Sequence, residues 1–272
     1  MSGVEVTELN VYPVKSMRGT SLARASLTAT GLEWDRQWMV VDGKGTFLSQ
    51  RTHPQLARIV PEVRDDTLLL SAPGLAVLTV PLRLAGTPVP VRVWDDACVG
   101  VEQGSEAHAW MSRAVGQAVR LVRVPPGSGR HANPKFAGAV AAPVTFTDGY
   151  PILVCNEASL ADLNDRLPEP IPMERFRPNI VLRGLPAWAE DRIDSIVIGA
   201  VTLRLVKPCT RCVIPSIDQH TGQSSTDPTP ALRKFRFSKE LRGVMFGENA
   251  VMLTGAGERI GRGAPVEVCF EA

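Results

Sequence analysis

The segment Lys207–Asp218 contains the residues of this chain that are best suited to catalysis or metal binding. It places Cys209 and Cys212 three residues apart, with Arg211 directly before the second cysteine. A cysteine thiolate is a soft ligand for transition metals. The guanidinium of Arg211 would favour a neighbouring thiolate at neutral pH and could also bind an anionic cofactor. Three chemistries are therefore open: structural zinc, dithiol redox, and a single thiolate ligand to a redox metal.

A structural zinc site requires four ligands, usually supplied as two close pairs. The sequence contains one Cys-x-x-Cys pair and no second Cys or His pair. The nearest downstream histidine, His220, follows Cys212 by eight residues, which is not a usual spacing. This spacing of cysteines and histidines argues against a structural zinc site.

A dithiol centre normally precedes a helix whose N-terminus lowers the thiol pKa. Pro215 makes the residues after Cys212 poor helix material. If the segment stays extended, Cys209 and Cys212 project to opposite faces, with Cα atoms about 10 Å apart. That distance exceeds the disulfide limit of about 7 Å. The extended geometry favours one metal-ligating cysteine and one packed cysteine, and two ordinary buried cysteines remain an alternative.

Three further segments could bind an anion. The turn Tyr12–Gly19 contains an ammonium and a hydroxyl, from Lys15 and Ser16, together with backbone N–H groups. Arg36 lies between two tryptophans, where its guanidinium could stack or meet a planar anion. Arg177 precedes a proline, which predicts an extended, outward-presented arginine. A solvated turn or ordinary packing is the alternative interpretation for each segment.

Length and composition describe an ordinary globular protein of 272 residues, with 44% hydrophobic and 21% charged residues. A net charge of +2 argues against binding to nucleic acid or to a membrane surface. The five scattered cysteines do not form a secreted disulfide framework. No signal peptide and no apolar window of membrane-spanning length is present. We therefore expect a cytoplasmic protein without nucleic-acid or membrane partners.

Many short, closely spaced strand patterns with few helices predict a mainly β (α+β) fold of barrel or sandwich type. Ser105 is expected to cap one helix and Asn156 another, and a third helical patch covers 230–239. The Pro/Gly-rich stretch 125–134 suggests a boundary between two parts, 1–125 and 126–272. The predicted strands are 4–14, 21–28, 37–41, 46–50, 68–71, 76–80, 89–94, 98–102, 152–154, 179–183, 195–198, 201–206, 251–253 and 265–269.

Several motifs occur in a characteristic order along nearly the whole chain. They are Tyr12–Ser16, Asp35–Arg36, Gln50–Arg51, Asn156–Leu160, Phe176–Asn179, Cys209–Cys212, Asp218 with Thr221–Gly222, and Phe246–Asn249. This order resembles the MOSC proteins, named for the C-terminal domain of molybdenum cofactor sulfurase. The branch it resembles contains the mitochondrial amidoxime reducing component and its bacterial relatives.

The resemblance implies an N-terminal β-rich MOSC-associated domain, 1–125, whose first strands could pack with the other part, and a C-terminal MOSC β-barrel with a few helices, 126–272. It also implies a molybdenum cofactor (Mo-molybdopterin) whose metal is held by Cys212, with Cys209 left to pack. The implied cofactor-binding residues are Lys15, Ser16, Arg36, Asp148, Gly149, Tyr150, Arg177, Thr210, Arg211 and Asn249. Asn249 occupies a position that is tyrosine in some members.

The activity implied by the resemblance is reduction of small N-hydroxylated substrates, such as amidoximes and N-hydroxylated bases. The chain starts at its first strand, without the targeting segment of the mitochondrial members, and lacks the iron–sulfur domain of some bacterial members. We therefore expect an external electron donor, a flavin or iron–sulfur reductase. One alternative is a non-catalytic carrier of molybdenum cofactor or sulfur, and a second is a Cys-x-x-Cys dithiol redox protein.

Overall fold

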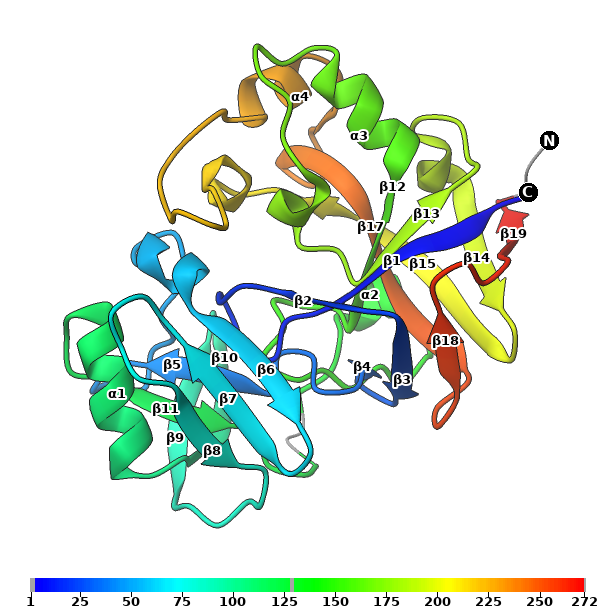
Figure 1. Cartoon of the computed structure of the whole chain (residues 1–272). Helices are drawn as coiled ribbons and strands as arrows, with labels where there is room; N and C mark the ends of the chain where they lie inside the picture. The colour runs from blue at the N-terminus through cyan, green and yellow to red at the C-terminus, as the bar shows by residue number, and fades with distance from the viewer. Residues whose placement is uncertain (1–2, 128–129, 272) are drawn as a thin grey trace.

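The computed structural model describes residues 3–127 and 130–271. It is strand-rich with four short α-helices in those ranges, which confirms the predicted mainly β fold. Figure 1 shows two parts, with α1 and β5–β11 gathered on one side and a large curled sheet with α3 and α4 on the other.

The large sheet has nine strands and curls into a half-barrel. Its order is β19-β14-β15-β17-β12-β13-β1-β2, and β16 pairs with β17. Alternation of apolar and polar residues places a continuous apolar core against this sheet, with Leu9, Val154 and Leu203 fully buried. The strands are β1 (Glu5–Val11), β2 (Thr20–Leu22), β12 (Ile152–Asn156), β13 (Ile180–Arg183), β14 (Ile193–Ile198), β15 (Val201–Thr210), β16 (Phe237–Ser238), β17 (Gly243–Thr254) and β19 (Glu267–Phe270).

Three smaller sheets complete the strand architecture, in the orders β5-β11-β10-β9, β6-β7-β8 and β18-β3-β4. A second core, which includes Trp38, Trp110 and Leu121, lies between the first two of these sheets and α1. Their strands are β3 (Arg24–Thr28), β4 (Gly31–Leu32), β5 (Trp38–Val41), β6 (Val60–Arg64), β7 (Thr67–Ser71), β8 (Leu78–Pro81), β9 (Pro88–Val93), β10 (Asp96–Glu102), β11 (Arg120–Arg123) and β18 (Arg259–Gly261).

The helices are short and pack against strands in the interior of the sheets. They are α1 (Ser105–Val115), α2 (Pro134–Ala137), α3 (Glu157–Asn164) and α4 (Thr229–Phe235), with 3₁₀ turns η1 (Pro54–Arg58), η2 (Met173–Phe176), η3 (Ala189–Arg192) and η4 (Ile214–Ser216). Helix α1 packs on β11, α2 on β15, α3 on β12 and β13, and α4 on β17. The Asn156 cap is confirmed, because its side chain accepts a hydrogen bond from the backbone N–H of Ala158 at 3.1 Å. The Ser105 cap is wrong, because Gly104 is the capping residue and Ser105 is already helical.

The first strand connects the two parts. β1 pairs antiparallel with β13, so the N-terminal residues belong to the half-barrel sheet before the chain enters the smaller part. The predicted strand at 46–50 is wrong: Thr46 and Phe47 make only isolated bridges, and the chain turns again at residues 50–52, so no continuous ladder forms. The boundary between residues 125 and 126 stays a prediction.

Candidate functional site

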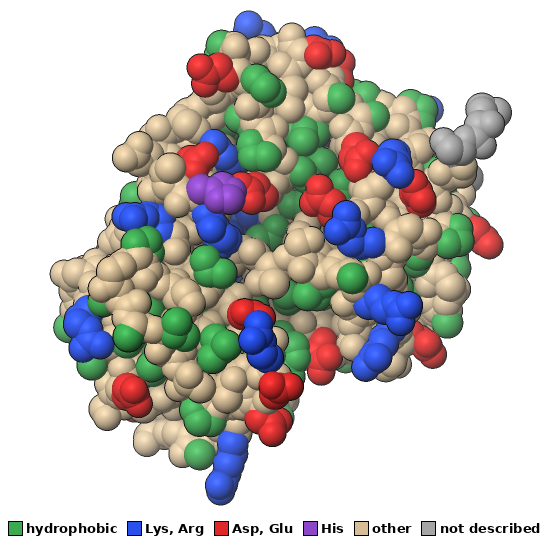
Figure 2. All heavy atoms as spheres, in the orientation of Figure 1, with side chains coloured by type: hydrophobic (Ala, Val, Ile, Leu, Met, Phe, Trp, Pro, Cys, Tyr) green, Lys and Arg blue, Asp and Glu red, His purple; other side chains and the backbone are tan. Residues whose placement is uncertain are grey.

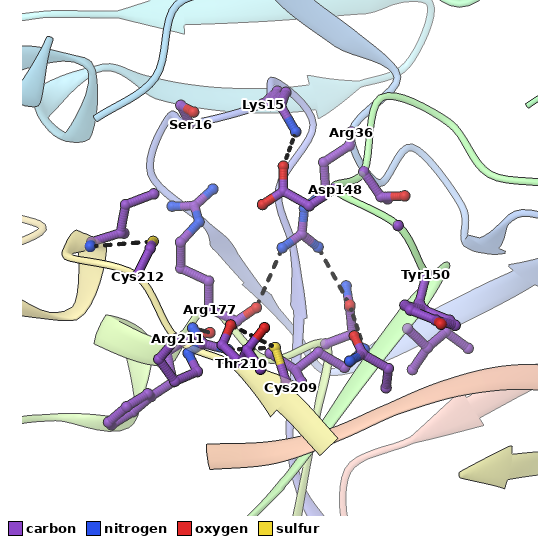
Figure 3. Close-up of a pocket in the computed structure, with 18 of the residues that line it drawn as sticks. Lys15, Ser16, Arg36, Asp148, Tyr150, Arg177, Cys209, Thr210, Arg211 and Cys212 are labelled. Carbon is purple, nitrogen blue, oxygen red and sulfur yellow. Dashed lines mark hydrogen bonds and ion pairs between the residues drawn. The ribbon is translucent and has the colours of Figure 1, made fainter. Parts of the chain in front are cut away.

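A pocket of about 870 Å³, including its open mouth, is lined by residues from both parts of the molecule. Figure 3 shows side chains from the turn after β1, from the end of β15 and from the segment before β12 surrounding one space. All eleven residues assigned a role from the sequence line it: Lys15, Ser16, Arg36, Asp148, Gly149, Tyr150, Arg177, Thr210, Arg211, Cys212 and Asn249. The fold brings these positions together, and their individual roles stay predictions.

The turn after β1 presents Lys15 to the pocket. Lys15 is almost fully buried, and its ammonium donates to the carbonyl of Phe146 at 2.8 Å and to the carboxylate of Asp148. Burial lowers the pKa of Lys15, while Asp148 acts in the opposite direction. For Asp148, desolvation opposes the charge, but Lys15 and then Arg51 hold the pKa of the carboxyl below its usual range. Lys15 and Asp148 thus form a charge-assisted pair in which each partner favours the charged form of the other.

Two guanidiniums lie over the buried ring of Tyr12. The Cζ atoms of Arg36 and Arg177 are 4.2 Å and 4.3 Å from the ring centroid. The Tyr12 hydroxyl donates to the carbonyl of Pro178 at 3.2 Å, which fixes the ring. Burial, and then the charge of Arg36, lowers the pKa of Arg177 to about 10. Arg177 therefore remains cationic at neutral pH.

The predicted extended backbone of Arg177 is wrong. Arg177 ends η2 in a left-handed conformation, with φ 58° and ψ 46°. Its N–H donates to the carbonyl of Glu174 at 3.0 Å, so the residue acts as the C-cap of the 3₁₀ turn. This backbone lets its guanidinium donate to the carbonyl of Met17 at 2.7 Å.

The predicted opposite-face arrangement of the two cysteines is also wrong. β15 ends at Thr210, so the chain is no longer extended at Cys212, and Cys209 and Cys212 line the same pocket. Arg211 donates to the sulfur of Cys209 at 3.0 Å and to the carbonyl of Phe176 at 2.7 Å, so its guanidinium contacts the first cysteine. Cys209 also packs against the apolar cluster beneath the pocket.

The thiol of Cys212 faces the pocket with a single weak contact. The backbone N–H of Ile214 donates to its sulfur at 3.5 Å. Burial disfavours the charge of Arg211, but the nearby sulfurs of Cys209, Cys155 and Cys212 raise its pKa. Arg211 therefore donates a hydrogen bond to the sulfur of Cys209 and not to that of Cys212. Cys212 lines the same pocket as the five cationic side chains.

Polar groups on the other wall remain available to a ligand. The hydroxyl of Tyr150 is buried without a hydrogen-bond partner among the described residues. Burial raises its pKa to about 12, so it is a neutral donor at physiological pH. Asn249 on β17 donates to the carbonyl of Lys207 at 3.1 Å, which orients its amide oxygen. An unsatisfied donor in a wall is expected where a ligand with acceptors binds.

The charge balance of the pocket favours an anion. The described lining residues include five cations and one carboxylate: Lys15, Arg36, Arg51, Arg177 and Arg211, against Asp148. Guanidinium and ammonium groups suit phosphate oxygens, and an accessible cysteine sulfur suits a soft metal. These residues therefore fit a group that combines an anionic tail with a soft metal centre.

Arg51 and Asn179 also line the pocket but received no role from the sequence. The amide oxygen of Asn179 accepts from the backbone of Leu153 at 3.1 Å and from Arg36 at 3.3 Å. Both residues lie inside motifs that carried the family resemblance. Their position in those motifs could have predicted that they line the pocket.

Three further features concern the cysteines, the metal-ligating side chains and the helices of the described residues. The five cysteines are free thiols in the described structure. Within residues 3–127 and 130–271 no cluster of three His, Cys, Asp or Glu side chains is placed to hold a metal ion. None of the helices in these ranges has the length and apolar character needed to cross a bilayer.

The chain matches two domain families, described as "MOSC N-terminal beta barrel domain" over residues 3–118 and "MOSC domain" over residues 141–267. It is 34% identical over 257 residues to mitochondrial amidoxime-reducing component 1 of Mus musculus, covering 89% of this chain and 74% of that protein. It is 33% identical over 241 residues to mitochondrial amidoxime reducing component 2 of Bos taurus, covering 85% and 72%. It is 30% identical over 260 residues to molybdenum cofactor sulfurase of Bos taurus, covering 88% of this chain and 30% of that protein.

Proposed function

The chain belongs to the MOSC family, in the branch of the mitochondrial amidoxime-reducing components, and we propose that it is a molybdenum-cofactor-dependent reductase of N-hydroxylated compounds. One observation carries the proposal: the thiol of Cys212 opens into a pocket lined by five cations. A soft-metal ligand surrounded by phosphate-binding side chains is the donor set that such a cofactor requires.

Under this proposal, Lys15, Arg36 and Arg177 bind the phosphate of the cofactor, with Ser16 at the same turn. Thr210, Asp148, Gly149, Tyr150 and Asn249 contact the pterin, and Arg211 holds the loop that carries the ligand Cys212. When bound, the cofactor would supply two-electron redox chemistry at molybdenum. The protein would bind and orient it.

The reaction converts an amidoxime, two electrons and two protons into an amidine and water. The electrons come from a separate protein, and we propose a flavin or iron–sulfur reductase as the donor. The names of the relatives place them in mitochondria, and a cytoplasmic location for this chain stays a prediction.

The test uses protein produced in a host that makes the cofactor, with benzamidoxime as substrate and a reduced viologen dye as artificial donor. We expect benzamidine to form with the parent and with Cys269→Ser, which removes an exposed cysteine outside the pocket, but not with Cys212→Ser. Cofactor content without turnover would identify the carrier alternative. Turnover without molybdenum would favour the dithiol alternative.

A further inference from the structure

Arg51 differs from the other cations that line the pocket. Lys15, Arg36, Arg177 and Arg211 each donate hydrogen bonds to protein oxygens. Among the described residues, Arg51 makes no hydrogen bond and no ion pair, and its guanidinium lies 4.5 Å from the centre of the Trp94 ring. Stacking on an aromatic ring leaves the N–H groups at the guanidinium edge open for a planar anion.

Trp94 adopts a strained, left-handed backbone conformation. β9 and β10 pair through Val93 and Asp96, so Trp94 and Asp95 form a two-residue hairpin loop. Trp94 has φ 55°, a conformation that such loops normally give to glycine or asparagine. Strain of this kind persists where the surroundings hold the residue, and it often marks a functional site.

The surroundings of Trp94 connect it to the pocket. Its indole N–H donates to the carboxylate of Asp148 at 3.0 Å, and its ring meets Phe47 edge-on at 5.0 Å. Phe47, Arg51 and Asp148 all line the pocket. Trp94 itself is 44% exposed, whereas Lys15 and Arg177 in the same site are at most 8% exposed. Arg51 and Trp94 therefore form the rim of the pocket, on the solvent side of the buried cations.

Asp148 makes no hydrogen bond or ion pair with Arg51, although the charge of Arg51 lowers the pKa of its carboxyl. Asp148 is paired with Lys15 and accepts from Trp94 through the same oxygen. Of the cations proposed to hold the cofactor phosphate, Lys15 and Arg177 are buried, and the Arg36 side chain is 15% exposed. An anion that reaches Arg51 would thus enter from solvent, as the distal end of a substrate whose reacting group lies deeper in the pocket.

We propose that Arg51, stacked on Trp94, forms an outer subsite that binds the carboxylate of an N-hydroxylated substrate. The subsite rests on the proposed function and narrows its substrate class to N-hydroxylated compounds that carry an acidic group distant from the N–O bond. A guanidinium with an open edge binds a carboxylate through two parallel N–H···O bonds.

The test compares 4-carboxybenzamidoxime with its neutral analogue 4-carbamoylbenzamidoxime. Binding of each to the holoprotein is measured by calorimetry without a reductant, so that no turnover occurs. We expect the carboxylate to bind about tenfold more tightly, because a charge-assisted hydrogen bond exceeds its neutral counterpart by about that factor. The preference for the carboxylate over the neutral analogue should vanish in Arg51→Gln. It should be intermediate in Arg51→Lys, which keeps the positive charge but lacks the two parallel N–H donors of a planar guanidinium.

Arg64→Gln is the matched control, because it removes the same charge from an exposed residue on β6 that is paired with Glu62. It should leave the preference unchanged. Equal binding of the two compounds to the parent, or an undiminished preference in Arg51→Gln, would overturn the subsite. Loss of molybdenum from Arg51→Gln with the preference retained would also overturn it, because Arg51 would then hold the cofactor.

If Arg51→Gln does not fold, the comparison of Arg51→Lys with Arg64→Gln decides the question by the same criteria. The two proposals fail in different ways. Turnover of both amidoximes with equal affinity refutes the subsite and leaves the function standing. Absence of turnover by molybdenum-loaded protein refutes the function, whatever the binding preference.

Discussion

Gln50 and Gln219 form a reciprocal amide pair across the junction of the two parts. Each side-chain NH₂ donates to the other's oxygen, at 2.9 Å and 3.0 Å, and both residues are buried. Gln50 also donates to the carbonyl of Ser16, and Arg177 donates to the oxygen of Gln219 at 3.3 Å. The pair therefore ties the turn after β1 to the loop that follows Cys212.

Gln219→Leu should lower the free energy of unfolding by about 2 to 3 kcal/mol, because it leaves the Gln50 amide and one Arg177 donor unsatisfied in the interior. Chemical denaturation measures the change. The control is Gln223→Leu, which alters an exposed side chain on the same loop. A loss below about 0.5 kcal/mol, the usual range for exposed positions, would show that water replaces the pair.

Gly19→Ala should destabilise the protein by about 1 to 3 kcal/mol. A Cβ at this position would lie 2.4 Å from Cε1 of Tyr12, whose buried ring carries Arg36 and Arg177. The matched control is Gly43→Ala, where an added Cβ meets nothing within 4 Å. Thermal unfolding of both variants checks this, and equal melting temperatures would mean that the Tyr12 ring can shift freely.

Glu248 should make the protein less stable as pH rises from about 4.5 to 9. Burial, and then the charges of Asp191 and Glu190, raises the pKa of Glu248 from 4.5 to about 9. Within this window the folded protein keeps a proton that the unfolded chain loses, so the free energy of unfolding falls with rising pH. The slope is at most about 1.4 kcal/mol per pH unit.

The Glu248→Gln variant should lack this contribution, so its stability relative to the parent should increase with pH. Denaturation at pH 5, 6.5 and 8 measures the difference, with Glu169→Gln, an exposed glutamate, as the control. A difference that stays constant with pH would show that Glu248 is ionised in the folded state.

Reduction of benzamidoxime should require an electron donor other than NADH or NADPH. The sequence contains neither a phosphate-cradling loop nor a dinucleotide-binding fingerprint. Activity should appear with a flavin or iron–sulfur reductase and decrease as salt rises, because exposed charges are screened within about 10 Å at 0.1 M. On the face shown in Figure 2, cationic and acidic side chains are interspersed over both parts, so we expect a moderate salt effect. Robust turnover with NADH alone would reveal a missed nucleotide or flavin site.

The fold class could be predicted from local strand patterns, and eleven of the twenty pocket residues from the family resemblance. Alternating apolar residues identify strands such as β1, and the motifs that carried the family resemblance contain Lys15, Arg177 and Cys212. The end of β15 at Thr210 could not be predicted, because pairing of β15 with Met245 on β17, and the bulge beside it, determine where the extended chain stops.

The backbone conformation of Arg177 was predicted wrongly because it also depends on the structure around it. The rule for residues before proline disfavours the right-handed helical region, and the capping of η2 selected the left-handed one. The role proposed for Arg51 depends on Trp94, 43 positions further along the chain, and on a hairpin loop whose strain no local pattern indicates. A contact between residues so far apart in the sequence can be identified only from the structure.

The molybdenum content of three proteins tests the central claim most directly. The parent, Cys212→Ser and Cys209→Ser are produced in the same cofactor-competent host and compared by elemental analysis. We predict molybdenum in the parent and in Cys209→Ser, whose sulfur is engaged by Arg211, and its loss from Cys212→Ser. Equal molybdenum content in the parent and Cys212→Ser, or no molybdenum in any of the three, would contradict the assignment of this pocket as a molybdenum-cofactor site.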